Sequence, residues 1–175
     1  MSGLNRRELL LTLTGAAFAI QTPFQLTAAE PGKPLFFTND EFAALDTLTE
    51  LIVPTDDHSP GAKTAGVAAY IDRSVAEAFL PEEKTSWRKG LALVNELSRS
   101  MNDKSFNKAS HEQQVAVLTK MAKNEKDPKT PAEKFFTQLK QTTAFAYYSS
   151  SVGIHQDMNY KGNVLLPQFV GYAVT

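Results

Sequence analysis

The residues best suited to chemistry form a short polar run, Asp56-Asp57-His58, with Asp72 further along the chain. Two carboxylates beside an imidazole can bind a metal ion or transfer protons. A zinc site usually takes three or four His, Cys or carboxylate ligands, and a calcium loop takes alternating carboxylates followed by a later glutamate. Neither spacing occurs here, so a metal centre has little support.

The same run stands between Pro54 and Pro60-Gly61, a composition typical of a loop. Aspartates in loops often accept hydrogen bonds from nearby backbone N–H groups. We therefore expect these aspartates to order the loop by accepting N–H groups around residues 61–66. Contact with a partner protein and metal binding are the two alternatives.

Other signatures of catalysis or cofactor binding do not occur in the sequence. No G-x-S-x-G elbow accompanies His111 or His155, and no G-x-G-x-x-G or P-loop is present. The chain has no cysteine, which excludes disulfides, thiolate metal ligands, C-x-x-C haem attachment and a cysteine nucleophile. We predict that this chain binds no cofactor and does not catalyse a reaction on its own.

Aromatic residues gather toward the C-terminus, where they could fill a core or form an interface. Aromatic side chains are enriched at the energetic centres of protein interfaces. Together with the polar loop they make a candidate partner interface. Its residues are Pro54, Thr55, Asp56, Asp57, Tyr147, Tyr148, Tyr160, Phe169 and Tyr172.

The elements that would position these residues are helices. Capping boxes begin at Thr38, Ser110 and Thr130, each with Glu or Gln three residues later. Apolar residues follow at helical spacing, and Tyr70 and Phe79 are among those expected on a buried face. The spacing predicts an all-α bundle of about five helices, over residues 38–52, 65–80, 81–101, 110–122 and 130–148.

The remainder, from about residue 149 to Thr175, shows no clear helical or strand period. Such a long irregular tail is unusual inside a compact domain. Its run Val164-Leu165-Leu166 is more apolar than disordered segments usually are. We expect the tail to dock on a partner or back across the bundle.

The N-terminus has the layout of an export leader. Arg6-Arg7 stands directly before a short apolar stretch that ends near Ile20, and Ala28-Ala29 supplies small residues for cleavage. We interpret residues 1–29 as a twin-arginine signal peptide, with an ordinary secretory signal as the alternative. Residues 30–37 then form a linker, and 38–175 form the helical domain. The twin-arginine route carries folded proteins, often with a cofactor bound, so the sequence predicts a periplasmic protein.

The net charge of the chain is −1, and the leader contributes +1 through two arginines and one glutamate, which leaves −2 for the rest. This balance offers no basic surface for nucleic acid or for an anionic membrane. We therefore expect no nucleic-acid partner.

Several motifs together carry a family likeness. The chain resembles the gluconate 2-dehydrogenase subunit 3 family over about residues 36–172. The resemblance rests on Phe36-Phe37-Thr38, Leu51-Ile52-Val53-Pro54-Thr55-Asp56-Asp57, Pro60-Gly61-Ala62, Ala65-Gly66-Val67, Tyr147-Tyr148-Ser149-Ser150 and Tyr160-Lys161-Gly162-Asn163. Val164 departs from the proline that often follows the Gly-Asn pair in relatives.

The resemblance implies a non-catalytic small subunit of a periplasmic FAD-dependent sugar, sugar-acid or polyol dehydrogenase. In such complexes a large subunit of the glucose–methanol–choline type holds the FAD, and a cytochrome c, as a subunit or as a separate protein, takes the electrons. The small subunit supports folding and export of the flavoprotein, and the complex can associate with the membrane. The alternatives are a stand-alone periplasmic binding or scaffold protein, and an enzyme in its own right.

Overall fold

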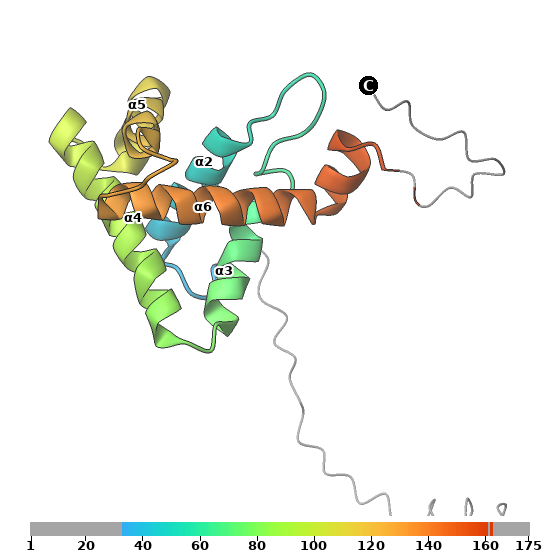
Figure 1. Cartoon of the computed structure of the whole chain (residues 1–175), viewed down its shortest axis with the longest axis horizontal. Helices are drawn as coiled ribbons and strands as arrows, with labels where there is room; N and C mark the ends of the chain where they lie inside the picture. Colours follow the sequence, from blue (N-terminus) through green and yellow to red (C-terminus); the bar gives the residue numbers. More distant parts are fainter. Residues whose placement is uncertain (1–32, 161, 163–175) are drawn as a thin grey trace, which may run out of the picture. The chain divides into compact units, whose positions relative to one another are not determined.

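The computed structural model describes residues 33–160 and Gly162. The chain divides into two units, residues 1–31 and 32–175, and all described residues belong to the second. Within the described part there are five α-helices and no strand, which confirms the predicted all-α class (Figure 1). The helices are α2 (Asn39–Ile52), α3 (Val67–Glu77), α4 (Pro81–Asn102), α5 (His111–Ala122) and α6 (Pro131–Tyr148), with a 3₁₀ turn η2 (Phe106–Lys108) and a π-helical turn η3 (Gly153–Asp157).

The three predicted capping boxes start helices as expected. In each box the N-cap hydroxyl of Thr38, Ser110 or Thr130 accepts a hydrogen bond from the third helical N–H, and the Glu or Gln side chain at that position bonds back to the N-cap N–H. These reciprocal bonds satisfy two N–H groups that the first turn of a helix leaves without a helical partner. The starts of α2, α5 and α6 are therefore set by local sequence.

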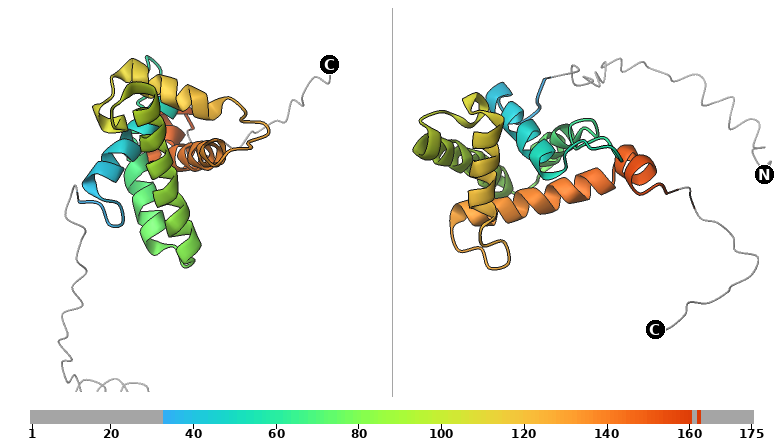
Figure 2. Two further views of the ribbon diagram at one scale, coloured as in Figure 1. Left: turned by 90° about the vertical axis from the view of Figure 1, so that its left-hand side faces the viewer. Right: turned by 90° about the horizontal axis from the view of Figure 1, so that it is seen from above.

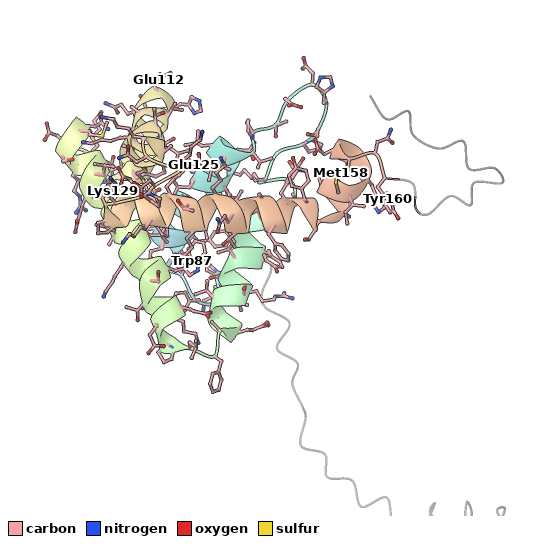
Figure 3. All side chains as sticks on the ribbon, viewed as in Figure 1. Trp87, Glu112, Glu125, Lys129, Met158 and Tyr160 are labelled. Carbon is pink, nitrogen blue, oxygen red and sulfur yellow. The ribbon has the colours of Figure 1, made fainter. Side chains whose placement is uncertain are left out.

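Helix α6 is the central element of the described unit, because it contacts each of the other four α-helices. Figure 1 shows α6 lying across α3 and α4. The contact between α4 and α6 is close: a Cβ at Gly90 would stand 2.0 Å from the ring of Phe135. That ring meets Trp87 edge to face at a centroid distance of 5.7 Å, and Figure 3 labels Trp87 at this crossing. The core residues that α6 contributes are Phe135, Phe136, Leu139, Thr143, Ala146 and Tyr147.

Helix α3 is shorter than the sequence predicts. It ends at Glu77 and not at Leu80, since Pro81 forces the preceding residue into an extended conformation. Phe79, expected on the buried face, is 96% exposed, and Tyr70 is 46% exposed. The prediction of burial was wrong for both residues: Phe79 lies past the true end of the helix, and Tyr70 lies on a face of α3 that is only partly covered.

The start of the predicted irregular tail is also corrected. After α6 the chain turns at Ser149, and residues 151–157 are helical, ending in η3. The Ser150 hydroxyl accepts a hydrogen bond from the Gly153 N–H, and a Cβ at Gly153 would lie 2.2 Å from the Tyr147 carbonyl oxygen. Only glycine allows so tight a turn, which the sequence pattern did not reveal. Residues 163–175 lie outside the described residues.

Within the described ranges, 33–160 and 162, no helix has both the length and the apolar character needed to cross a bilayer.

The N-terminus of α6 is held by Glu133, a nearly buried carboxylate. It accepts hydrogen bonds from the backbone N–H groups of Thr130 (2.9 Å) and Lys129 (2.8 Å), and from the Asn124 amide (2.6 Å). These donors favour the ionised form and lower the pKa of Glu133 from about 4.5 to about 2. Glu133 thereby fastens the loop after α5 to the start of α6.

We expect Glu133→Gln to destabilise the protein at neutral pH, with a difference that shrinks as the pH falls. Because the pKa is lower in the folded state, the unfolded chain binds more protons between pH 4.5 and 2, so this contribution is full above about pH 5 and is lost toward pH 2. Urea unfolding across this range measures it, with Glu96→Gln on the exposed face of α4 as control. A difference that is independent of pH would contradict this account.

Candidate partner-contact surface

The polar loop between α2 and α3 is organised by Glu50, a residue that sequence analysis did not single out. One carboxylate oxygen of Glu50 accepts from the N–H and the hydroxyl of Thr55, both at 3.0 Å, and the other accepts from the Lys63 N–H at 2.8 Å. The Thr55 hydroxyl in turn accepts from the Gly61 N–H. A Cβ at Gly61 would lie 2.5 Å from the backbone nitrogen of Thr55, so glycine is required there. The loop is thus folded around one carboxylate.

Asp56 of this loop bonds to backbone N–H groups only two and three residues further along the chain. Asp56 accepts hydrogen bonds from the N–H groups of His58 (2.8 Å) and Ser59 (2.9 Å), and these bonds lower the pKa of Asp56. The predicted loop-ordering role is therefore confirmed for Asp56, but at residues 58–59. Glu50, and not an aspartate of this loop, accepts the backbone N–H of Lys63. Pro54 and Asp57 are exposed on the loop.

Asp72 does not join the loop. Its carboxylate is 3% exposed and accepts the N–H groups of Leu35 (2.5 Å), Phe36 (3.0 Å) and Phe37 (2.9 Å). This contact spans 35 to 37 residues of sequence, so no local pattern could have indicated it. The residues at the end of the predicted linker are therefore part of the folded unit.

The three histidines are not gathered into one cluster. His58, His111 and His155 lie exposed on three separate elements, and no group of three or more His, Cys, Asp or Glu in the described part of the chain is arranged to hold a metal ion.

Tyr147 joins the polar loop to α6. Its side chain is 1% exposed, and its hydroxyl donates a 2.7 Å hydrogen bond to the Pro60 carbonyl oxygen. The prediction that Tyr147 is a contact residue is corrected, because a buried side chain supports a surface without forming it. Figure 1 shows the loop rising beside the C-terminal end of α6, next to η3.

Tyr148 and Tyr160 are half-exposed at this same end of α6. The Tyr148 ring meets Tyr147 edge to face at 5.2 Å, and the nearby Asp157 carboxylate raises the pKa of Tyr148. Tyr160 follows η3, where its N–H donates to the Ile154 carbonyl oxygen at 2.9 Å. Figure 3 labels Met158 and Tyr160 beyond the C-terminal end of α6, whereas Glu125 and Lys129 are labelled toward its N-terminal end.

Two further aromatics extend this surface. Phe145 is 62% exposed one turn before Tyr148, and its ring lies 6.3 Å from that of Tyr70 on α3. We call Tyr70, Phe145 and Tyr148 the aromatic ridge. The i, i+3 spacing of Phe145 and Tyr148 signalled a shared helix face. The sequence did not indicate which face of α6 is buried, because aromatic residues occur on both faces of this helix.

Several predicted site residues lie outside the described residues: Arg6, Arg7, Phe169 and Tyr172.

Comparison with known proteins identifies the family. Residues 39–164 match the gluconate 2-dehydrogenase subunit 3 family, which covers the described helices from α2 to η3. The chain belongs to this family. No curated protein and no solved structure matches the chain. Members of the gluconate 2-dehydrogenase subunit 3 family are, by name, one subunit of a dehydrogenase complex. The predicted resemblance is confirmed, and an exposed aromatic ridge is the kind of surface that a subunit of a complex needs.

We expect Tyr147→Phe to loosen the polar loop without unfolding the helices. The change removes the hydroxyl that holds the Pro60 carbonyl and should cost about 1 kcal/mol. Faster hydrogen exchange at residues 54–62, together with a small decrease in Tm, would show it. Tyr70→Phe, which removes an exposed hydroxyl, is the matched control. Equal exchange in the two variants would contradict the role of Tyr147.

Proposed function

We propose that this protein is the non-catalytic small subunit of a periplasmic FAD-dependent dehydrogenase that oxidises a sugar, a sugar acid or a polyol. It binds a large flavoprotein subunit of the glucose–methanol–choline type and supports the folding and twin-arginine export of that subunit. FAD belongs to the partner, and a cytochrome c accepts the electrons. Family membership supports the assignment to a dehydrogenase complex.

The observation that carries the proposal is the aromatic ridge beside the ordered polar loop. Tyr70, Phe145 and Tyr148 expose large apolar area from two helices that pack against each other. Rigid aromatic side chains bind with little loss of conformational freedom and supply most of the energy at many interfaces. The ridge is therefore the expected centre of contact with the catalytic subunit.

The electrostatics of the described carboxylates agree with a supporting role. Glu50, Asp56, Asp72 and Glu133 all accept backbone N–H groups. Backbone donors occupy the oxygens of these carboxylates, which leaves the oxygens less available to a substrate. Their hydrogen bonds hold loops in place, which suits a protein that presents a surface.

We expect Phe145→Ser to weaken capture of the catalytic subunit by at least tenfold, since truncating a central aromatic anchor often costs 2 kcal/mol or more. Co-purification from a strain that makes both chains measures the effect. Val115→Ser on α5 is the matched control, because Val115 is also an exposed apolar residue (41%) and lies on a different helix. Equal capture by both variants would place the interface elsewhere.

Production of the flavoprotein with and without this chain tests the supporting role. We expect a lower yield, less bound FAD and no periplasmic flavoprotein when this chain is absent. In a second arm, Arg6→Lys combined with Arg7→Lys should retain the flavoprotein in the cytoplasm while the complex still forms. Equal yield, FAD content and export in all strains would contradict the proposal.

A further inference from the structure

The segment Leu35-Phe36-Phe37, here called the strap, is fastened to the helical unit by one buried carboxylate. Three consecutive backbone N–H groups of the strap donate to Asp72 on α3, which is 3% exposed. Hydrogen bonds to a charged acceptor are stronger than neutral ones, and a buried carboxylate without donors would be costly. The strap and Asp72 therefore depend on each other.

Helix α4 holds the strap from another side. The Arg88 guanidinium stacks 4.5 Å from the centre of the Phe36 ring and donates to the Phe36 carbonyl oxygen at 3.1 Å. The Phe37 side chain is 4% exposed and meets the Trp87 ring edge to face at 6.4 Å. Because Asp72 comes from α3 and these contacts come from α4, the strap can be bound only when the two helices are packed together.

The strap fixes the point at which the chain enters the folded unit. Five residues, Glu30–Pro34, separate it from the end of the predicted leader, and an extended segment of this length spans at most about 18 Å. Only the C-terminal end of the leader is therefore tethered within this distance of the strap.

The strap and the aromatic ridge lie on different sides of α3. Tyr70 and Asp72 are two residues apart, which on an α-helix is a rotation of about 200°, so their side chains point in nearly opposite directions. Tyr70 contacts Phe145 of α6, whereas Asp72 contacts the strap. In the left view of Figure 2 the strap (blue) and α6 (orange) stand on opposite sides of α3 and α4.

Asp72 and Arg88 each hold the strap, and we call the two together the clamp. We infer that the clamp makes this subunit a two-sided adapter. The clamp holds the strap, which follows the leader in the chain, on one face of the helical unit. It can do so only after α3 and α4 have packed together. The aromatic ridge on the opposite face binds the catalytic subunit. The leader can then be bound by export machinery without displacing the partner. The identity of the partner in this inference rests on the proposed function. The existence of the clamp, which requires only that α3 and α4 are packed, does not.

The clamp is tested on the full chain alone by limited digestion with chymotrypsin, which cleaves after aromatic residues. In the wild-type protein we expect cleavage between Phe36 and Phe37 to be slow. Asp72→Asn should accelerate it at least tenfold, because a neutral amide cannot hold three donors. Arg88→Gln, an exposed site where no buried charge is left behind, should accelerate it less. Asp127→Asn, an exposed carboxylate elsewhere, should have no effect.

Because Trp87 contacts the strap, far-ultraviolet circular dichroism, which reports the helices, shows whether Asp72→Asn remains folded at the digestion temperature. If Asp72→Asn unfolds, the comparison of cleavage rates between Arg88→Gln and the wild-type protein decides whether the clamp exists. Cleavage at Phe36 that is as fast in the wild-type protein as in Arg88→Gln overturns the clamp.

The separation of the two faces is tested with a bulky label. Because the chain has no cysteine, Lys33→Cys and Gln141→Cys each create a unique attachment site for a polyethylene glycol maleimide. Lys33 is exposed beside the strap, and Gln141 is exposed one turn before Phe145. Labelling at residue 33 should leave capture of the catalytic subunit unchanged, and labelling at residue 141 should abolish it.

The outcomes of the labelling experiment distinguish failure of the two-sided arrangement from failure of the proposed function. Equal loss of capture from both labels overturns the two-sided arrangement but leaves the proposed partner in place. Failure of the unlabelled variants and the wild-type chain to capture the flavoprotein overturns the proposed function and the adapter with it. In that case the digestion result still decides whether the clamp exists.

Discussion

The packing of α6 against the other four α-helices is the constraint on which the described structure depends. One side of α6 must supply core residues to all of them, and at Gly90 the fit leaves no room even for a methyl group. The same helix must also carry Phe145 and Tyr148 on its exposed edge. Because the buried side is held from several directions, the exposed aromatics are presented on a rigid support. Rigidity of this kind reduces the entropy lost when a partner binds.

Buried and half-buried carboxylates fasten the parts of the unit that lack regular structure. Glu50 holds the loop before α3, Asp72 holds the strap before α2, and Glu133 holds the loop before α6. Each accepts several backbone N–H groups that would otherwise be left without partners. A chain without cysteine cannot use disulfides for this purpose. Of the acidic residues that first suggested chemistry, Asp56 and Asp72 also accept backbone N–H groups, whereas Asp57 is exposed on the polar loop beside the aromatic ridge.

Local features of the sequence predicted the helices well, and non-local contacts account for what was missed. The capping boxes at Thr38, Ser110 and Thr130 involve residues three apart, so their pattern is visible in the chain. The bond from Tyr147 to Pro60 spans 87 residues, and the bonds to Asp72 span 35 to 37. Tyr70 and Phe145 form one surface only because α3 and α6 pack together. Hydrophobic spacing alone assigned Tyr70 to the core, since it records which faces are apolar and not which of them become covered.

The account requires that one face of this subunit, the ridge on α3 and α6 with the polar loop beside it, is covered in the assembled dehydrogenase. Hydrogen–deuterium exchange of the subunit alone and in complex with its catalytic partner measures this coverage directly. We expect slower exchange in the complex at residues 54–60, 67–72 and 141–150, and unchanged exchange in α5. Protection confined to α5, or no protection around Phe145 in a complex that has formed, would contradict the central claim.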